Sequence, residues 1–149
     1  MKNIRQARAE DAARIAEIEV FNYRMNFYPI FKSDWFYFEE LQVPRVMDKY
    51  LKDIALLNRT YVYDDGVVKG FVRVNNTEVE KLFVEPVFHG KSIGAQLLEY
   101  AVAEKNADCL WALEKNVRAI SFYERQGFHL NGERKLEEGT DEYLVLMRK

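Results

Sequence analysis

The chain has 149 residues, which is close to the length of one domain at roughly 150 residues per domain, so we expect a single domain over residues 1–149. Hydrophobic residues make up 48% of it and aromatic residues 14%, which is enough to fill a core without a disulfide or a structural metal. The 22 basic and 24 acidic residues give a net charge of -2 with no long run of one sign, which argues against a nucleic-acid partner and a polybasic membrane anchor.

The first elements in chain order are a strand and two helices. Residues 3–8 alternate weakly, as a strand does, and the acidic pair Glu10-Asp11 opens a helical pattern that continues to about Tyr23. A second helix is expected over residues 39–57, with Pro44 either near its start or kinking it.

An unusual aromatic segment lies between these helices. Residues 21–38 contain nine aromatic side chains and one proline, Pro29. We interpret the segment as an irregular connection packed by its own rings. The alternative is that some of the rings line a substrate pocket, because long loops on a rigid scaffold often carry recognition.

The second half predicts strands with two further helices. Residues 60–63 and 67–74 flank an Asp-Gly turn and, with a strand over 78–85, form an antiparallel meander. The remaining pattern is a helix over about 92–105, a strand over 108–113, a helix over about 117–126, and closing strands over 128–136 and 142–147. The resulting order, βααβββαβαββ, predicts an α/β fold, a mixed sheet of the α+β kind with helices on both faces and one β-α-β crossover.

The segment over residues 80–98 carries the densest chemical signal. It reads as a strand stopped by Pro86, a loop with Gly90 and Gly94, and a helix that starts near Ser92. Backbone N–H groups in such a loop and first helical turn have no helical partners, and with the helix dipole they form a site for an anion such as a phosphate.

Two motifs in the chain resemble those of the GCN5-related N-acetyltransferase (GNAT) superfamily. Val84 and Pro86, followed by the run over residues 89–94, resemble the family's strand ending in V-x-P and its R/Q-x-x-G-x-G/A signature. Asn116, Ala119 and the run over residues 122–128 resemble its N-x-x-A-x-x-x-Y-x-x-x-G-F segment. His89 and Ser92 depart from the signature, where Arg or Gln and Gly are usual.

The resemblance implies acetyl-CoA as co-substrate. It places the pyrophosphate on the loop and helix start, the pantetheine arm along the preceding strand where two central strands separate, and Asn116 near the pantetheine. The implied cofactor-binding residues are Leu82, Phe83, Val84, His89, Gly90, Lys91, Ser92, Ile93, Gly94, Ala95, Asn116 and Tyr123. A histidine beside a pyrophosphate would favour its protonated form, and the Ser92 hydroxyl could cap the helix or meet a phosphate oxygen.

The resemblance also implies direct attack of an amine on the thioester. The backbone N–H of Val84 would polarise the thioester carbonyl, and Tyr123 matches the family's general acid near the sulfur. Strand alternation places Glu80 on the same face as Leu82 and Val84, so Glu80 is the candidate general base. The alternatives are a buried packing ring for Tyr123 and a solvated strand residue for Glu80.

The acceptor is predicted to be the primary amine of a small molecule. Phe27, Tyr28 and Trp35, with acidic residues beside them, would suit a small cationic or aromatic amine through cation–π contact and ion pairing. A peptide or protein amine is the rival substrate, and a non-catalytic acyl-CoA sensor or interaction module is the alternative from another class. A Rossmann-type binder is weaker, because the glycine spacing differs from G-x-G-x-x-G.

The remaining sequence features favour a cytoplasmic protein without a metal. Cys109 is the single cysteine, which excludes an intrachain disulfide, favours a reducing compartment and is interpreted as structural. His129 is interpreted as an ordinary strand residue, and two histidines without clustered carboxylates predict no metal site. The N-terminal stretch lacks the apolar run of a secretory signal, and no apolar window approaches the length of a membrane span. The final hairpin and the aromatic segment are the candidate surfaces for a homodimer.

Overall fold

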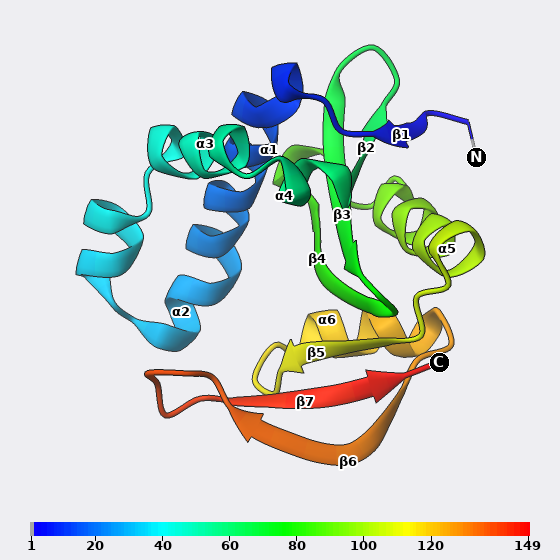
Figure 1. Ribbon diagram of the computed structural model, residues 1–149. Helices are drawn as coiled ribbons and strands as arrows, with labels where there is room; N and C mark the ends of the chain where they lie inside the picture. The colour runs from blue at the N-terminus through cyan, green and yellow to red at the C-terminus, as the bar shows by residue number, and fades with distance from the viewer. Residues whose placement is uncertain (1) are drawn as a thin grey trace.

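The computed structural model describes residues 2–149, in which seven strands form one mixed sheet with helices on both faces (Figure 1). The strand order across the sheet is β1-β2-β3-β4-β5-β7-β6. The strands are β1 (Ile4–Gln6), β2 (Thr60–Asp64), β3 (Val68–Asn75), β4 (Glu78–Val84), β5 (Cys109–Leu113), β6 (His129–Leu136) and β7 (Tyr143–Arg148). The predicted fold class and element order are confirmed.

The helices cover two separate apolar cores. One core lies between the sheet and the helices of the first half of the chain, and the other lies between the opposite face and α5. The main helices are α1 (Ala12–Asn22), α3 (Val43–Lys52), α4 (Ile54–Asn58), α5 (Ile93–Lys105) and α6 (Val117–Arg125). The expected second helix is divided at Asp53, whose side chain accepts a hydrogen bond from the Ala55 N–H at 3.1 Å and caps α4. The helix also begins later than expected, at Val43 rather than residue 39, so that Pro44 lies in its first turn.

The interpretation of residues 21–38 as an irregular connection is wrong. Much of this segment is helical, in a π-helical turn η2 (Tyr23–Phe27), a short helix α2 (Tyr28–Phe31) and a second π-helical turn η3 (Trp35–Glu40). Pro29 is the second residue of α2, directly after the π-helical turn η2. The segment extends the first helix, so its rings are held in fixed directions.

The central strands separate within the sheet. The antiparallel meander β2–β3–β4 is confirmed, and α5 connects β4 to β5 in a parallel crossover. The β4–β5 pair is joined at only two positions, Glu78 with Cys109 and Val79 with Leu110. Beyond Val79 the two strands diverge, which leaves one edge of β4 without a neighbouring strand (Figure 1).

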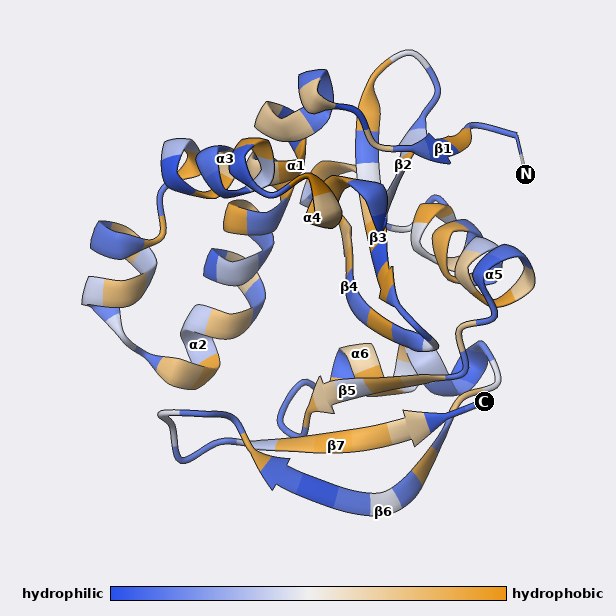
Figure 2. Ribbon diagram, in the orientation of Figure 1, coloured by the Kyte–Doolittle hydropathy of each residue, from blue (hydrophilic) through white to orange (hydrophobic). Residues whose placement is uncertain are grey.

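The last hairpin closes the far edge of the sheet. Strand β7 is apolar and buried at its centre, whereas every residue of the edge strand β6 is exposed and most are polar (Figure 2). Charged side chains on an edge strand discourage pairing with another chain. Within residues 2–149 no helix is both long and apolar enough to cross a bilayer.

Candidate functional site

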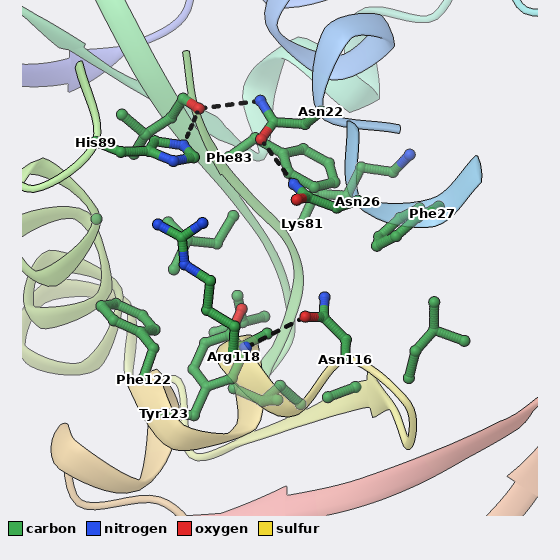
Figure 3. Close-up of a pocket in the computed structure, with 18 of the residues that line it drawn as sticks. Asn22, Asn26, Phe27, Lys81, Phe83, His89, Asn116, Arg118, Phe122 and Tyr123 are labelled. Carbon is green, nitrogen blue, oxygen red and sulfur yellow. Dashed lines mark hydrogen bonds between the residues drawn. The ribbon is translucent and has the colours of Figure 1, made fainter. Parts of the chain in front are cut away.

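A cleft of about 740 Å³ opens where β4 and β5 separate. Its walls come from the end of α1 with η2 and α2, from β4 and β5, from the loop before α5 and its first turn, from α6, and from the turn between β6 and β7. Figure 3 shows the part of the cleft between α1, β4 and α6. The two sequence motifs therefore meet in one place, although about twenty residues separate them along the chain.

The end of β4 offers unpaired backbone groups to this cleft. The Glu85 N–H donates to the Lys69 carbonyl at 2.9 Å, across the β3–β4 ladder. Because N–H groups alternate in direction along a strand, the amides of Leu82 and Val84 point the other way, toward the edge that β5 has left. An extended ligand could pair with this edge as an additional strand does.

Two side chains hold the Val84 carbonyl. Asn22 Nδ2 donates to it at 3.0 Å, and His89 Nε2 lies 2.8 Å from it. A carbonyl only accepts, so Nε2 carries the proton in this hydrogen bond. The contact closes the loop from Val84 to His89 and gives His89 a structural role that the sequence does not predict (Figure 3).

The loop and first turn of α5 form a cradle of backbone amides. The Gln96 N–H donates to the Ser92 carbonyl at 3.0 Å, so the earlier amides of the helix, those of Ile93, Gly94 and Ala95, have no helical acceptor. A Cβ added at Gly90 would meet nothing within 4 Å, and one at Gly94 would meet Phe122 and Val84 only at ordinary contact distances. The fold therefore leaves room at these glycines for a phosphate group to approach the backbone.

Ser92 adopts a left-handed backbone conformation at the start of α5. Its φ is 65°, and its side chain makes no capping hydrogen bond, so the capping role considered for it is not seen. A capping residue normally has extended backbone angles, which place its oxygen over the following amides. The usual glycine at this position would adopt the same conformation without a Cβ penalty.

Replacing Ser92 by glycine should therefore stabilise the protein by about 1 kcal/mol, since the left-handed conformation costs a residue with a Cβ roughly 1–2 kcal/mol. Thermal unfolding of Ser92→Gly measures the change. Ser121→Gly is the matched control, because Ser121 lies inside α6 and the same substitution there should lower stability. A lower melting temperature for Ser92→Gly would contradict the strain argument.

Helix α6 and its N-cap residue bring three polar side chains to the cleft. Asn116 caps the helix, with its Oδ1 accepting from the Ala119 N–H at 3.3 Å, which leaves its Nδ2 free to donate. Burial raises the pKa of Tyr123 to about 12, so this phenol keeps its proton at neutral pH. Arg118, which the sequence analysis missed, extends from α6 across the cleft (Figure 3). Its guanidinium could bind a phosphate.

The opposite wall carries aromatic rings in helical register. Tyr23, Phe27 and Phe31 are spaced four residues apart and all line the cleft, where Phe83 of β4 packs against the first two. Of the three rings predicted to bind substrate, only Phe27 lines the cleft. Tyr28 turns away to donate to Asp34 at 2.5 Å, and Trp35 is 65% exposed outside it. The four-residue spacing could have identified the correct rings.

Glu80 does not share a face with Leu82 and Val84, so that prediction is wrong. A β-bulge shifts the β3–β4 register, with Arg73 opposite Lys81 but Val74 opposite Val79. The extra residue on β4 reverses the alternation at that point. The Glu80 carboxylate instead accepts from Arg73 Nε at 2.8 Å and lies 3.5 Å from Arg59.

A chain of buried polar groups continues from Arg73 beneath the cleft. Arg73 donates to the Tyr50 hydroxyl at 3.0 Å, and Tyr50 donates to the Glu19 carboxylate at 2.8 Å. Lys81 lies 3.4 Å from the same carboxylate and donates to the Tyr23 hydroxyl at the cleft wall. Burial lowers the pKa of Lys81, and the charge of Glu19 opposes that shift.

Other candidate chemistry is absent from the part of the chain that the structure covers. No group of three or more His, Cys, Asp or Glu side chains is placed to hold a metal within residues 2–149. The Cys109 thiol is half-buried on β5, its pKa is raised chiefly by burial, and it contacts the Thr77 carbonyl at 3.7 Å. A thiol in this state is a poor nucleophile.

Comparison with known proteins identifies related sequences and folds. A family profile described as "Acetyltransferase (GNAT) domain" matches residues 57–130. The chain is 25% identical to peptidyl-lysine N-acetyltransferase YjaB of Salmonella typhimurium over 98% of this chain and 96% of that protein. It is 32% identical to peptidyl-lysine N-acetyltransferase YiaC of Escherichia coli over 59% of each chain. The crystal structure of PaiA N-acetyltransferase from Thermoplasma acidophilum in complex with coenzyme A superposes with a TM-score of 0.68 at 19% identity, over 98% of both chains.

Proposed function

Because the chain belongs to the GNAT family of N-acetyltransferases, we propose that it transfers the acetyl group of acetyl-CoA to the primary amine of a lysine side chain in a peptide. One observation carries this proposal. The unpaired edge of β4 at Leu82 and Val84 lies in the same cleft as the amide cradle of α5 and the phenol of Tyr123.

The donor half of the cleft suits a pyrophosphate with an extended amide arm. The free amides of Ile93, Gly94 and Ala95 are the anion site, and Arg118 adds a positive charge opposite them. The edge at Leu82 and Val84 supplies backbone hydrogen bonds for the arm. Acetyl-CoA, when bound there, supplies the acetyl group as a thioester.

The transfer step needs an oxyanion donor and an acid from this chain. The Val84 N–H points to the free edge of β4. From there it would donate to the thioester oxygen as that oxygen gains charge, while the carbon–nitrogen bond forms and the carbon–sulfur bond breaks. Tyr123 gives its proton to the departing sulfur. The amine releases its proton to solvent, and the phenolate of Tyr123 regains a proton from solvent.

We propose that water accepts the proton of the amine. Glu80 lines the cleft, but its carboxylate is held by Arg73 and Arg59. Each of its two carboxylate oxygens is engaged by one of these arginines, so neither is left free to face an amine. The general-base role that sequence alternation assigned to Glu80 therefore becomes a structural role in this proposal.

The acceptor half favours an amine on a flexible alkyl arm. The rings of Tyr23, Phe27, Phe31 and Phe83 offer an apolar surface to methylene groups and π faces to a cation. Two of the relatives are described as peptidyl-lysine N-acetyltransferases, which favours a peptidyl lysine over the small-molecule amine expected from the sequence. Both acceptors present the same reacting group to the cleft.

Two measurements test the proposal. The first is the melting temperature with acetyl-CoA and with NADH as the control, since a ligand at 100 times its dissociation constant adds about 2.7 kcal/mol. We expect a shift with acetyl-CoA alone. The second is release of free thiol with lysine peptides or small primary amines as acceptors, for which we expect faster release with peptides. Activity with small amines alone would restore the small-molecule acceptor, and binding without thiol release would favour the acyl-CoA sensor.

A further inference from the structure

We propose that Glu137 recognises the positive charge of the acceptor amine and so determines acceptor specificity. The proposal deepens the proposed function and rests on it. Glu137 lies in the turn between β6 and β7, and its side chain lines the cleft opposite the rings of η2 and α2. No motif in the sequence marks this residue.

The backbone of Glu137 is fixed. Its N–H donates to the Glu142 carbonyl at 2.8 Å, and its own carbonyl accepts from the Thr140 N–H at 3.1 Å and from the Thr140 hydroxyl at 2.9 Å. These three hydrogen bonds hold the turn, so the carboxylate is presented to the cleft from a rigid base. Binding of a ligand then has to order only the side chain of Glu137 and not the turn that carries it.

The carboxylate of Glu137 is free to bind a cation. Within residues 2–149 it makes no ion pair and no side-chain hydrogen bond, whereas Lys81, the cation lining the same half of the cleft, is already engaged by Glu19 and Tyr23. Burial raises the pKa of the Tyr23 and Tyr37 phenols, and electrostatic repulsion from the Glu137 carboxylate raises each pKa further. An uncompensated negative charge in a ring-lined cleft favours an ammonium ligand.

The geometry separates two tasks in acceptor binding. Tyr23, Phe27 and Phe31 contact the alkyl arm along one wall, and Glu137 draws the charged end from the other. The amine must then lose its proton before attack, so Glu137 acts on binding and not on the transfer step.

The test compares Glu137→Gln with the wild type, using a short peptide that contains one lysine. We expect the KM for the peptide to rise about tenfold, which corresponds to about 1.4 kcal/mol, while kcat, the KM for acetyl-CoA and the melting temperature stay close to wild-type values. Glu138→Gln is the matched control, because Glu138 is the next residue of the same turn, is exposed and does not line the cleft. It changes the net charge equally and should leave the KM unchanged.

Three outcomes would overturn the proposal. An unchanged KM for Glu137→Gln removes the recognition role, and an equal rise for both variants indicates only the general charge of the surface. A loss of kcat at constant KM would make Glu137 a proton acceptor instead.

A binding measurement keeps this test independent of turnover. Calorimetry compares n-butylammonium with the uncharged n-pentanol, and we expect Glu137→Gln to lose the preference of the wild type for the cation. If the wild type acetylates no amine, the proposed function fails. The preference for the cation then still decides whether Glu137 binds positive charge, and equal preference in both proteins would reject that role.

Discussion

Replacing Tyr123 by phenylalanine should lower kcat by about 10²-fold, because a positioned general acid typically contributes 10²–10⁴-fold. The substitution removes one hydroxyl and keeps the ring, which packs edge to face against Phe122 and Phe128. The dissociation constant for acetyl-CoA and the melting temperature should therefore change little. Single-turnover acetyl transfer and calorimetric binding of acetyl-CoA measure the two effects separately.

The pH dependence of this variant gives a second readout. Burial raises the pKa of Tyr123 to about 12, so the phenol loses its proton only as the pH rises through that value. The ratio of wild-type to variant kcat should then stay constant between about pH 7 and pH 10, where the phenol remains protonated. Tyr100→Phe is the control, since the Tyr100 ring packs at a tilt against Tyr61, away from the cleft. Equal kcat in Tyr123→Phe and wild type would leave Tyr123 as a packing ring.

The donor half of the site could be predicted from the sequence because it depends on local features. Pro86 stops a strand, Gly90 and Gly94 leave space for a ligand, and Asn116 caps a helix; each effect acts within a few residues of the chain. The spacing of these residues along the chain predicts a loop, then the start of a helix, then a phenol. Arg118 lies inside the second motif but has no motif position of its own, and only the fold shows that it crosses the cleft.

The acceptor half depends on long-range contacts, and the sequence predicts it less well. The bulge that turns Glu80 away from Leu82 is a property of the β3–β4 pair, and alternation along one strand does not reveal it. The composition of residues 21–38 favours a loop, although Tyr23, Phe27 and Phe31 have helical spacing. Glu137 is separated by more than a hundred residues from the rings that it faces.

Replacing Arg73 by methionine should destabilise the protein by about 3–5 kcal/mol, the usual effect of removing one partner from a buried ion pair. Arg73 is 6% exposed and donates to both Glu80 and Tyr50. Without it, Glu80 keeps only the longer contact to Arg59, and the buried Tyr50 hydroxyl loses one donor. Chemical unfolding measures the loss.

Arg134→Met is the matched control for this effect. Arg134 forms an ion pair with Glu114 at 3.0 Å, but both side chains are nearly half exposed, so the loss should be no more than about 1 kcal/mol. Equal losses at the two sites would mean that burial does not strengthen the Arg73 pair.

The double variant Arg73→Met with Glu80→Leu separates structure from catalysis at this position. Replacing both partners by apolar side chains removes the uncompensated charge, so most of the lost stability should return. If Glu80 serves only to hold Arg73, the kcat of this double variant should stay near the wild-type value, because the Val84 amide and Tyr123 are unchanged. A stable double variant with a large loss of kcat would instead show that the carboxylate takes the proton of the amine and that its ion pairs orient it for that step.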